Sequence, residues 1–144
     1  MSTTAENTRI ALAIEDAWDR NDIAALDAYF APDFNNQQSA TPGVPAGLTG
    51  AKMAHGGVMA AFPDRKVHIL DTVAEGDKVL LRMKVTGTNT GGAPFLGAPE
   101  PNGAKIDFEM WSLYQLRDGK VIAHWGINDG ITGMIQVGGL KPPM

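Results

Sequence analysis

The chain has 144 residues, of which 44% are hydrophobic and 19% charged, and its formal net charge is −4. This length fits one domain over residues 1–144, no apolar run approaches the roughly 18 residues of a membrane span, and without cysteine there is no disulfide or thiolate chemistry. We expect no membrane and no nucleic-acid partner, because no cluster of lysine and arginine offers a surface for phosphates.

The N-terminus and the histidines bear on location and on metal binding. The first nine residues, MSTTAENTR, lack the basic and apolar regions of a signal peptide, so we expect a cytoplasmic protein. The histidines His55, His68 and His124 lie far apart, and no HxxxH motif or carboxylate-rich loop accompanies them. Since zinc and iron sites need several such ligands close together, we expect no metal.

Two helical segments open the chain. Thr3 and Glu6 have the spacing of a capping box, and apolar residues recur with the helical period from residue 10, which predicts a helix over about residues 4–20. After a polar Asn-Asp pair, apolar residues within 23–30 predict a short second helix that ends before Pro32. The two helices are expected to form a hairpin.

A loop and a third helix are predicted next. Residues 35–47 are first polar and then rich in proline and glycine, which is typical of a loop. Thr49 is then expected to cap a third helix that ends near Phe62. The N-terminal part of the chain is therefore predicted to be mainly helical.

The pattern then changes to the period of two that is typical of strands. Apolar and polar residues alternate most clearly over 79–85. Residues 75–77 and 117–120 contain Gly and Asp and predict two hairpin turns, the second between strands at about 105–116 and 121–127. The predicted strands form an antiparallel meander.

Helices followed by antiparallel strands predict an α+β fold in which three N-terminal helices pack on one face of a strongly curved antiparallel sheet, as in a conical barrel. Residues 89–103 are rich in glycine and proline, and their length is that of a functional loop or an arm that reaches a partner. The concave side of such a sheet would enclose an apolar interior, and a small ligand is expected to bind there.

Six short motifs occur along the chain in a fixed order. They are APDF at 31–34, AFPD at 61–64, AEGDKV at 74–79, GTNTG at 87–91, RDGKVIAHW at 117–125, and Asp129 followed by QVG at 136–138. Together and at this spacing they resemble the SnoaL-like polyketide cyclases, within the superfamily of nuclear transport factor and ketosteroid isomerase. The resemblance covers nearly the whole chain.

The resemblance implies a conical α+β barrel, a homodimer formed through the sheet, and a role in natural-product biosynthesis. Characterised relatives are similar in using side chains alone, so it also implies a reaction without a cofactor. The cyclases remove a proton beside a carbonyl, and the enolate then attacks a second carbonyl. Other members isomerise double bonds, open epoxides or assist hydroxylation, so the fold leaves the reaction open.

The chain departs from the family pattern at ionisable positions. The resemblance implies a general acid/base aspartate at the place of Gly126, and histidines at the place of Asn89 and near Gln37. Amides such as Asn36, Gln37 and Asn89 form hydrogen bonds but do not take up protons near neutral pH. These three are therefore candidates for holding polar atoms of a substrate rather than for removing a proton.

His124 and Asp129 are the candidate catalytic residues. His124 lies two residues before Gly126, hence on the same strand face, and its ordinary pKa suits proton transfer near pH 7. It could equally be a hydrogen-bonded histidine at a strand end. Asp129 could be a buried carboxylate with a raised pKa, or it could cap the turn that contains Gly130.

Strand parity divides the remaining candidates between the two faces of the sheet. The inward face carries the expected substrate-binding residues Met83, Met110, Ser112 and Tyr114. Tyr114 could polarise a substrate carbonyl or could anchor the core. Trp111 lies on the outer face, where an aromatic side chain suggests a contact between two copies of the chain.

Two functions of different classes remain open. One is a cofactor-free cyclase or isomerase that acts on a small apolar, polyketide-like molecule, either by acid/base chemistry or by folding the substrate into a reactive shape. The other is a binding or accessory protein on the same fold, in which Gly126 marks a lost acid/base function. His124 and Asp129 favour the enzyme, whereas Gly126, Asn89 and Gln37 favour the binding protein.

Overall fold

The structure is a computed structural model that describes residues 3–38 and 45–143, with the backbone alone at 35–38. The helices are α1 (Thr4–Asp19), the 3-10 helix η1 (Ile23–Ala28), α2 (Gly47–Ala61), the 3-10 turn η2 (Pro94–Leu96) and α3 (Gly130–Gln136). The strands are β1 (Phe30–Gln38), β2 (Lys66–Glu75), β3 (Lys78–Thr88), β4 (Lys105–Arg117) and β5 (Lys120–Asn128). Within the described residues, no helix is long and apolar enough to cross a membrane.

One five-stranded sheet, in the order β1-β5-β4-β3-β2, forms the body of the protein. The predicted antiparallel meander is confirmed for β2 to β5. The prediction of a purely antiparallel sheet is wrong, because β1 adds to β5 in parallel. A parallel pair joins strands that are far apart in the sequence, so no hairpin turn marks it.

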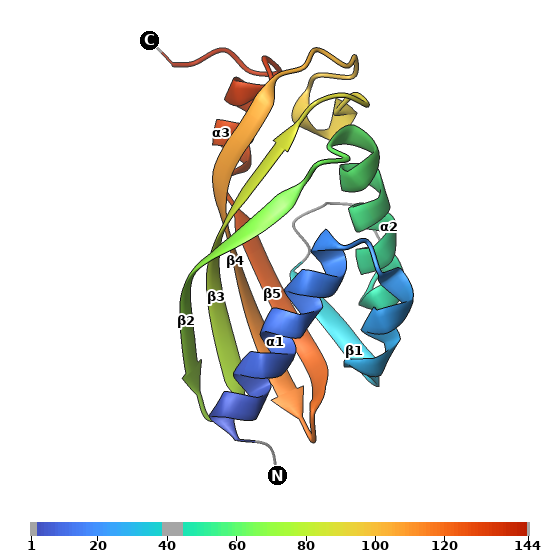
Figure 1. Ribbon diagram of the computed structural model, residues 1–144, viewed down its shortest axis with the longest axis vertical. Coiled ribbons are helices and arrows are strands. Elements are labelled where there is room, and N and C mark those ends of the chain that lie inside the picture. Colours follow the sequence, from blue (N-terminus) through green and yellow to red (C-terminus); the bar gives the residue numbers. More distant parts are fainter. Residues whose placement is uncertain (1–2, 39–44, 144) are drawn as a thin grey trace.

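The helices lie against this strongly twisted sheet as the α+β prediction requires (Figure 1). Helix α1 contacts β2 and β3, whereas α2 contacts β1. Both the helix over Thr4–Asp19 and its cap are confirmed, since the Thr3 hydroxyl accepts a hydrogen bond from the Glu6 amide. Helix α3, which contacts β4, was not predicted, because seven residues with two glycines carry little helical signal.

Two boundaries of the helical part differ from the prediction. The short second helix has 3-10 geometry and ends at Ala28, and the chain enters β1 at Phe30. Residues 35–38, expected in a loop, continue β1, because pairing with β5 outweighs their low strand propensity. Thr49 does not cap the third helix, which begins at Gly47 and has no side-chain cap.

Two apolar clusters hold the layers together. In the larger one, alternate residues of β3 point inward and are 0–4% exposed, and they pack on the buried stripe of α1. The smaller cluster lies where the end of α2 meets the loop at 89–103 and the residue after α3, with Phe62, Leu96 and Val137 at its centre. The loop, for which a functional loop or an arm that reaches a partner was expected, thus contributes buried residues to the body of the domain.

Candidate functional site

Three polar side chains meet on the inner face of β4 and β5. Ser112 and Tyr114 are 4% and 3% exposed, and they point inward as strand parity predicted. Ser112 is paired with Gly126 and Tyr114 with His124 across the two strands. The side chains of cross-strand pairs lie close together, so the sheet register alone brings these groups into contact.

His124 contacts both of its polar neighbours on this face. Its Nε2 lies 3.1 Å from Ser112 Oγ, and its ring packs on that of Tyr114 with centroids 4.9 Å apart. Burial lowers the pKa of His124 to about 4. The ring is therefore uncharged near neutral pH, where it is a weak base and a better hydrogen-bond partner than proton acceptor.

Glu15 on α1 extends this polar group, and sequence reasoning missed it. The Tyr114 hydroxyl donates to Glu15 Oε1 at 2.6 Å, and Glu15 is only 5% exposed. Burial raises the pKa of the Glu15 carboxyl, against the effects of the hydrogen bond from Tyr114 and of the Arg65 charge. The position of Glu15 in the sequence could have indicated this. It lies four residues after Ala11 and three before Trp18, a spacing that places its carboxylate at the edge of the buried stripe of α1.

His55 on α2 is a second buried polar group without a role in the sequence analysis. It is 8% exposed, and its ring lies 4.6 Å from that of Trp18 on α1. Burial lowers the pKa of His55 to about 4, and the Arg65 charge acts in the same direction. Its Nε2 has no hydrogen-bond partner in the structure, so a neutral imidazole acceptor is held between the two helices.

The methionines supply apolar surface beside the polar groups. Met83 and Met110 are cross-strand partners on the inner face, two residue pairs from Leu81 and Ser112. Met83 is fully buried in the main core, whereas Met110 is half-buried at its edge. Of the two, Met110 is the one whose partial exposure allows contact with a bound molecule.

The amide candidates are not brought together with these groups. The backbone of Asn36 pairs with that of His124, but the side chains of Asn36 and Gln37 lie outside the described residues. Asn89 is fully buried, and its amide donates to Glu100 O and Asn102 Oδ1 and accepts from the Gly92 amide. The expected role of Asn89 in holding a substrate is thus replaced by a structural one, because its hydrogen-bonding groups already organise the loop at 89–103.

Asp129 is exposed and caps α3, so the reading of it as a buried carboxylate with a raised pKa is wrong. Its carboxylate accepts from the Thr132 hydroxyl at 2.6 Å and from the Thr132 amide at 3.2 Å. These hydrogen bonds lower its pKa. Asp129 shares a surface recess with Trp111 and Ile127 of the outer face, away from the polar groups around His124.

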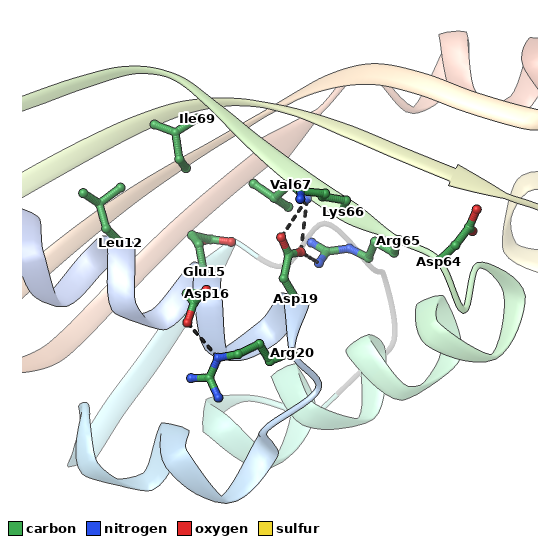
Figure 2. A pocket seen from close by; sticks show the side chains of 10 residues that line it. All are labelled: Leu12, Glu15, Asp16, Asp19, Arg20, Asp64, Arg65, Lys66, Val67 and Ile69. Atoms are coloured by element: carbon green, nitrogen blue, oxygen red, sulfur yellow. Dashed lines mark hydrogen bonds and ion pairs between the residues drawn. The ribbon is translucent and has the colours of Figure 1, made fainter.

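A cleft of about 480 Å³ runs between α1 and the start of β2. Figure 2 shows Glu15 and Asp19 extending from α1 on this side, whereas Asp16 turns toward Arg20. Asp19 accepts from the Arg65 guanidinium at 3.0 Å and from the amide of Val67, which ties α1 to β2. Within the described residues, no three His, Asp or Glu side chains are close enough to hold a metal ion, and the absence of a metal stays a prediction.

Solved structures with the same fold include proteins from several bacteria. AclR of Streptomyces galilaeus, a candidate hydroxylase, is 24% identical, with a TM-score of 0.84 over 99% of this chain and 87% of that one. A candidate polyketide cyclase of Bacillus cereus is 26% identical (TM-score 0.79; 92% and 80% covered). IdmH of Streptomyces antibioticus, also a candidate polyketide cyclase, is 25% identical (TM-score 0.77; 92% and 98% covered).

Comparison with curated proteins finds no match. The family model of the SnoaL-like polyketide cyclases, in contrast, matches residues 8–137, from the first half of α1 to the end of α3. That range holds the motifs that suggested the resemblance, except for Gly138 of the last one, and the inner face with its polar groups. The chain belongs to the SnoaL-like polyketide cyclase family.

Proposed function

We propose that the protein is a cofactor-independent cyclase or isomerase that closes or rearranges a ring on a small apolar, polyketide-like molecule. The observation that carries this proposal is the contact of Ser112, Tyr114 and His124 with one another on an otherwise apolar inner face. A few polar groups on an apolar wall are typical of small-molecule sites. Membership of the family supports a cyclase or isomerase over other reactions.

The chemical role of these groups follows from their protonation. The pKa of Tyr114 is raised well above its usual value by burial and by the Glu15 charge, so its hydroxyl keeps its proton. Ser112 and neutral His124 would hydrogen-bond a substrate carbonyl and stabilise the negative charge that develops on its oxygen, whereas the Tyr114 hydroxyl donates its proton to Glu15. In this arrangement, His124 orients and polarises the substrate, and Asp129 takes no part.

We also propose that two copies of the chain associate through the outer face of the sheet. Trp111 is 39% exposed and Ile127 is 62% exposed, and they are cross-strand partners on that face. Arg82 beside them forms ion pairs with Asp71 and Glu109. An apolar centre with a polar surround is the usual arrangement of an interface between subunits.

Heptane-2,6-dione tests the cyclase proposal, because an intramolecular aldol reaction followed by loss of water converts it into 3-methylcyclohex-2-enone, which absorbs in the ultraviolet. We expect the protein to accelerate this reaction, and His124→Ala to slow it by at least ~10-fold while the fold is retained. Asp129→Asn should keep the rate, because Asp129 caps α3 outside the site.

The binding-protein hypothesis predicts a different outcome of the same experiment. If NMR signals of the Met83 and Met110 methyl groups shift on addition of the diketone but no enone forms above the uncatalysed rate, the chain binds such molecules without turning them over. That result would contradict the cyclase proposal and would favour an accessory protein on the same fold.

A further inference from the structure

The Glu15 carboxyl is buried, and no ion pair joins it to a cation among the residues that the structure describes. Buried carboxylates are rare unless they are paired, and the nearby Arg65 guanidinium forms its ion pair with Asp19 instead. The hydrogen bond that Glu15 does form, at 2.6 Å from the Tyr114 hydroxyl, comes from β4 on the other side of the interior. Replacing a buried charged group by a well-packed apolar residue is often neutral or stabilising for the folded protein. Stability therefore does not account for Glu15 in the core, which points to a functional role.

Glu15 also lines the cleft between α1 and β2. Leu12, Val67 and Ile69 form the apolar part of the same cleft, and Arg65 and Lys66 lie at its other side (Figure 2). A volume of about 480 Å³ lies within the range of small-molecule sites. Glu15 thus bonds to the polar group of the inner face and is also one of the residues that line a cleft of suitable size.

We propose that Glu15 is the general acid/base of this protein, that it replaces the aspartate implied at Gly126, and that the substrate reaches it through the cleft between α1 and β2. This inference rests on the proposed function and names its proton acceptor. Gly126 is paired with Ser112, two residue pairs from Tyr114 and His124 and on the same face of the sheet. A carboxyl from α1 that touches Tyr114 therefore enters the part of the interior where the carboxyl from β5 is missing.

The proposed reaction is an intramolecular aldol addition that needs no oxidant or reductant. The Glu15 carboxylate removes a proton from the carbon beside a substrate carbonyl, so that the C–H bond breaks and an O–H bond forms on Glu15. The electron pair passes to the carbonyl oxygen, giving an enolate whose oxygen accepts hydrogen bonds from Ser112 and neutral His124. The enolate carbon attacks a second carbonyl of the same molecule, and the new alkoxide takes the proton back from Glu15.

The surroundings of Glu15 suit proton transfer near neutral pH. Burial raises its pKa, which brings a carboxyl closer to the operating pH that makes a general base effective. The charged and titratable groups that face it or share its cleft come from three places: Tyr114 on β4; Asp64, Arg65 and Lys66 at the start of β2; and Asp16, Asp19 and Arg20 at the end of α1. The charge of Arg65 lowers the pKa of Glu15, and the charge of its ion-pair partner Asp19 opposes this with a smaller effect.

The probe 5-nitrobenzisoxazole tests for this base without knowledge of the natural substrate. Removal of its C–H proton breaks the N–O bond and releases a coloured nitrophenolate. We expect the protein to accelerate this reaction and Glu15→Gln to lower the rate on the order of 10²–10⁴-fold. Glu75→Gln, a matched change at the exposed end of β2, should leave the rate unchanged.

The pH dependence separates catalysis from structure. The rate should rise with pH as Glu15 ionises, with a midpoint above the usual range of a glutamate, and Glu15→Gln should lose this inflection. No acceleration by the protein, full activity of Glu15→Gln, or loss of activity in His124→Ala alone would overturn the proposal. If Glu15→Gln does not fold, Tyr114→Phe is used in its place. The hydrogen bond from Tyr114 lowers the pKa of Glu15, so its loss should move the midpoint of the pH–rate profile upward. An unmoved midpoint would overturn the proposal.

A second variant tests the route. Ile69, 41% exposed, lines the cleft, so Ile69→Trp should fill it and reduce kcat/KM, whereas Ile131→Trp on α3 should not. Equal activity of the two variants overturns the entry through the cleft. The two proposals can fail separately. If Glu15→Gln still cyclises heptane-2,6-dione, the protein is a cyclase with another base. If the protein opens 5-nitrobenzisoxazole through Glu15 but does not cyclise the diketone, Glu15 is a base in a protein that is not an aldol cyclase.

Discussion

Removal of the Tyr114 hydroxyl, as Tyr114→Phe, takes away the donor that binds Glu15 at 2.6 Å in the core. A hydrogen bond to a charged group contributes about 1.5–3 kcal/mol to stability, and one between neutral groups about 0.5–1.5 kcal/mol. The loss should therefore be larger at alkaline pH, where Glu15 is ionised, than at acidic pH. For a chain of this length, the larger loss corresponds to a fall in Tm of roughly 5–10 °C.

The direction in which folding stability changes with pH follows from proton linkage. The folded pKa of Glu15 lies above its unfolded value, so stability is fully present at low pH and is lost as pH rises through the folded pKa. Tyr114→Phe raises that pKa further and steepens the loss. Urea unfolding at several pH values measures the free energy of unfolding of each variant. Tyr29→Phe, a change in the other tyrosine, is the control. Equal stability of Tyr114→Phe and the unchanged protein at all pH values would refute the reasoning.

Two further predictions concern the outer face and the buried histidine. Light scattering should find a dimer that Trp111→Ser weakens, since Trp111 is an exposed aromatic residue beside Ile127 on the outer face. A monomer at micromolar concentration, with stability unaffected by the substitution, would contradict the interface. The folded pKa of His55, about 4, lies below its ordinary value of 6.5, so protonation of the unfolded chain reduces stability as pH falls between these values. His55→Phe should flatten the acid side of the stability curve in urea titrations, and an unchanged slope would show that His55 is not the group responsible.

Local patterns in the sequence were sufficient for much of the fold. The Thr3 cap, the helix over Thr4–Asp19 and both hairpins depend on residues a few positions apart, and all were predicted. Strand parity also placed Ser112 and Tyr114 inward, because side chains alternate between the faces whatever the partner strand is. The alternation of residues along β4 was therefore enough to predict which of its side chains face the interior.

Tertiary structure decided which groups meet on that face. Tyr114 and Glu15 are 99 residues apart, and their contact exists because α1 packs across the sheet, which no spacing in the sequence records. The parallel pairing of β1 with β5 is likewise non-local. Asn89 and Asp129 have the residue types of a site, yet one is enclosed by its own loop and the other caps α3. Sequence determines which side chains can point inward, whereas the packing of distant elements determines their partners, their burial and hence their protonation.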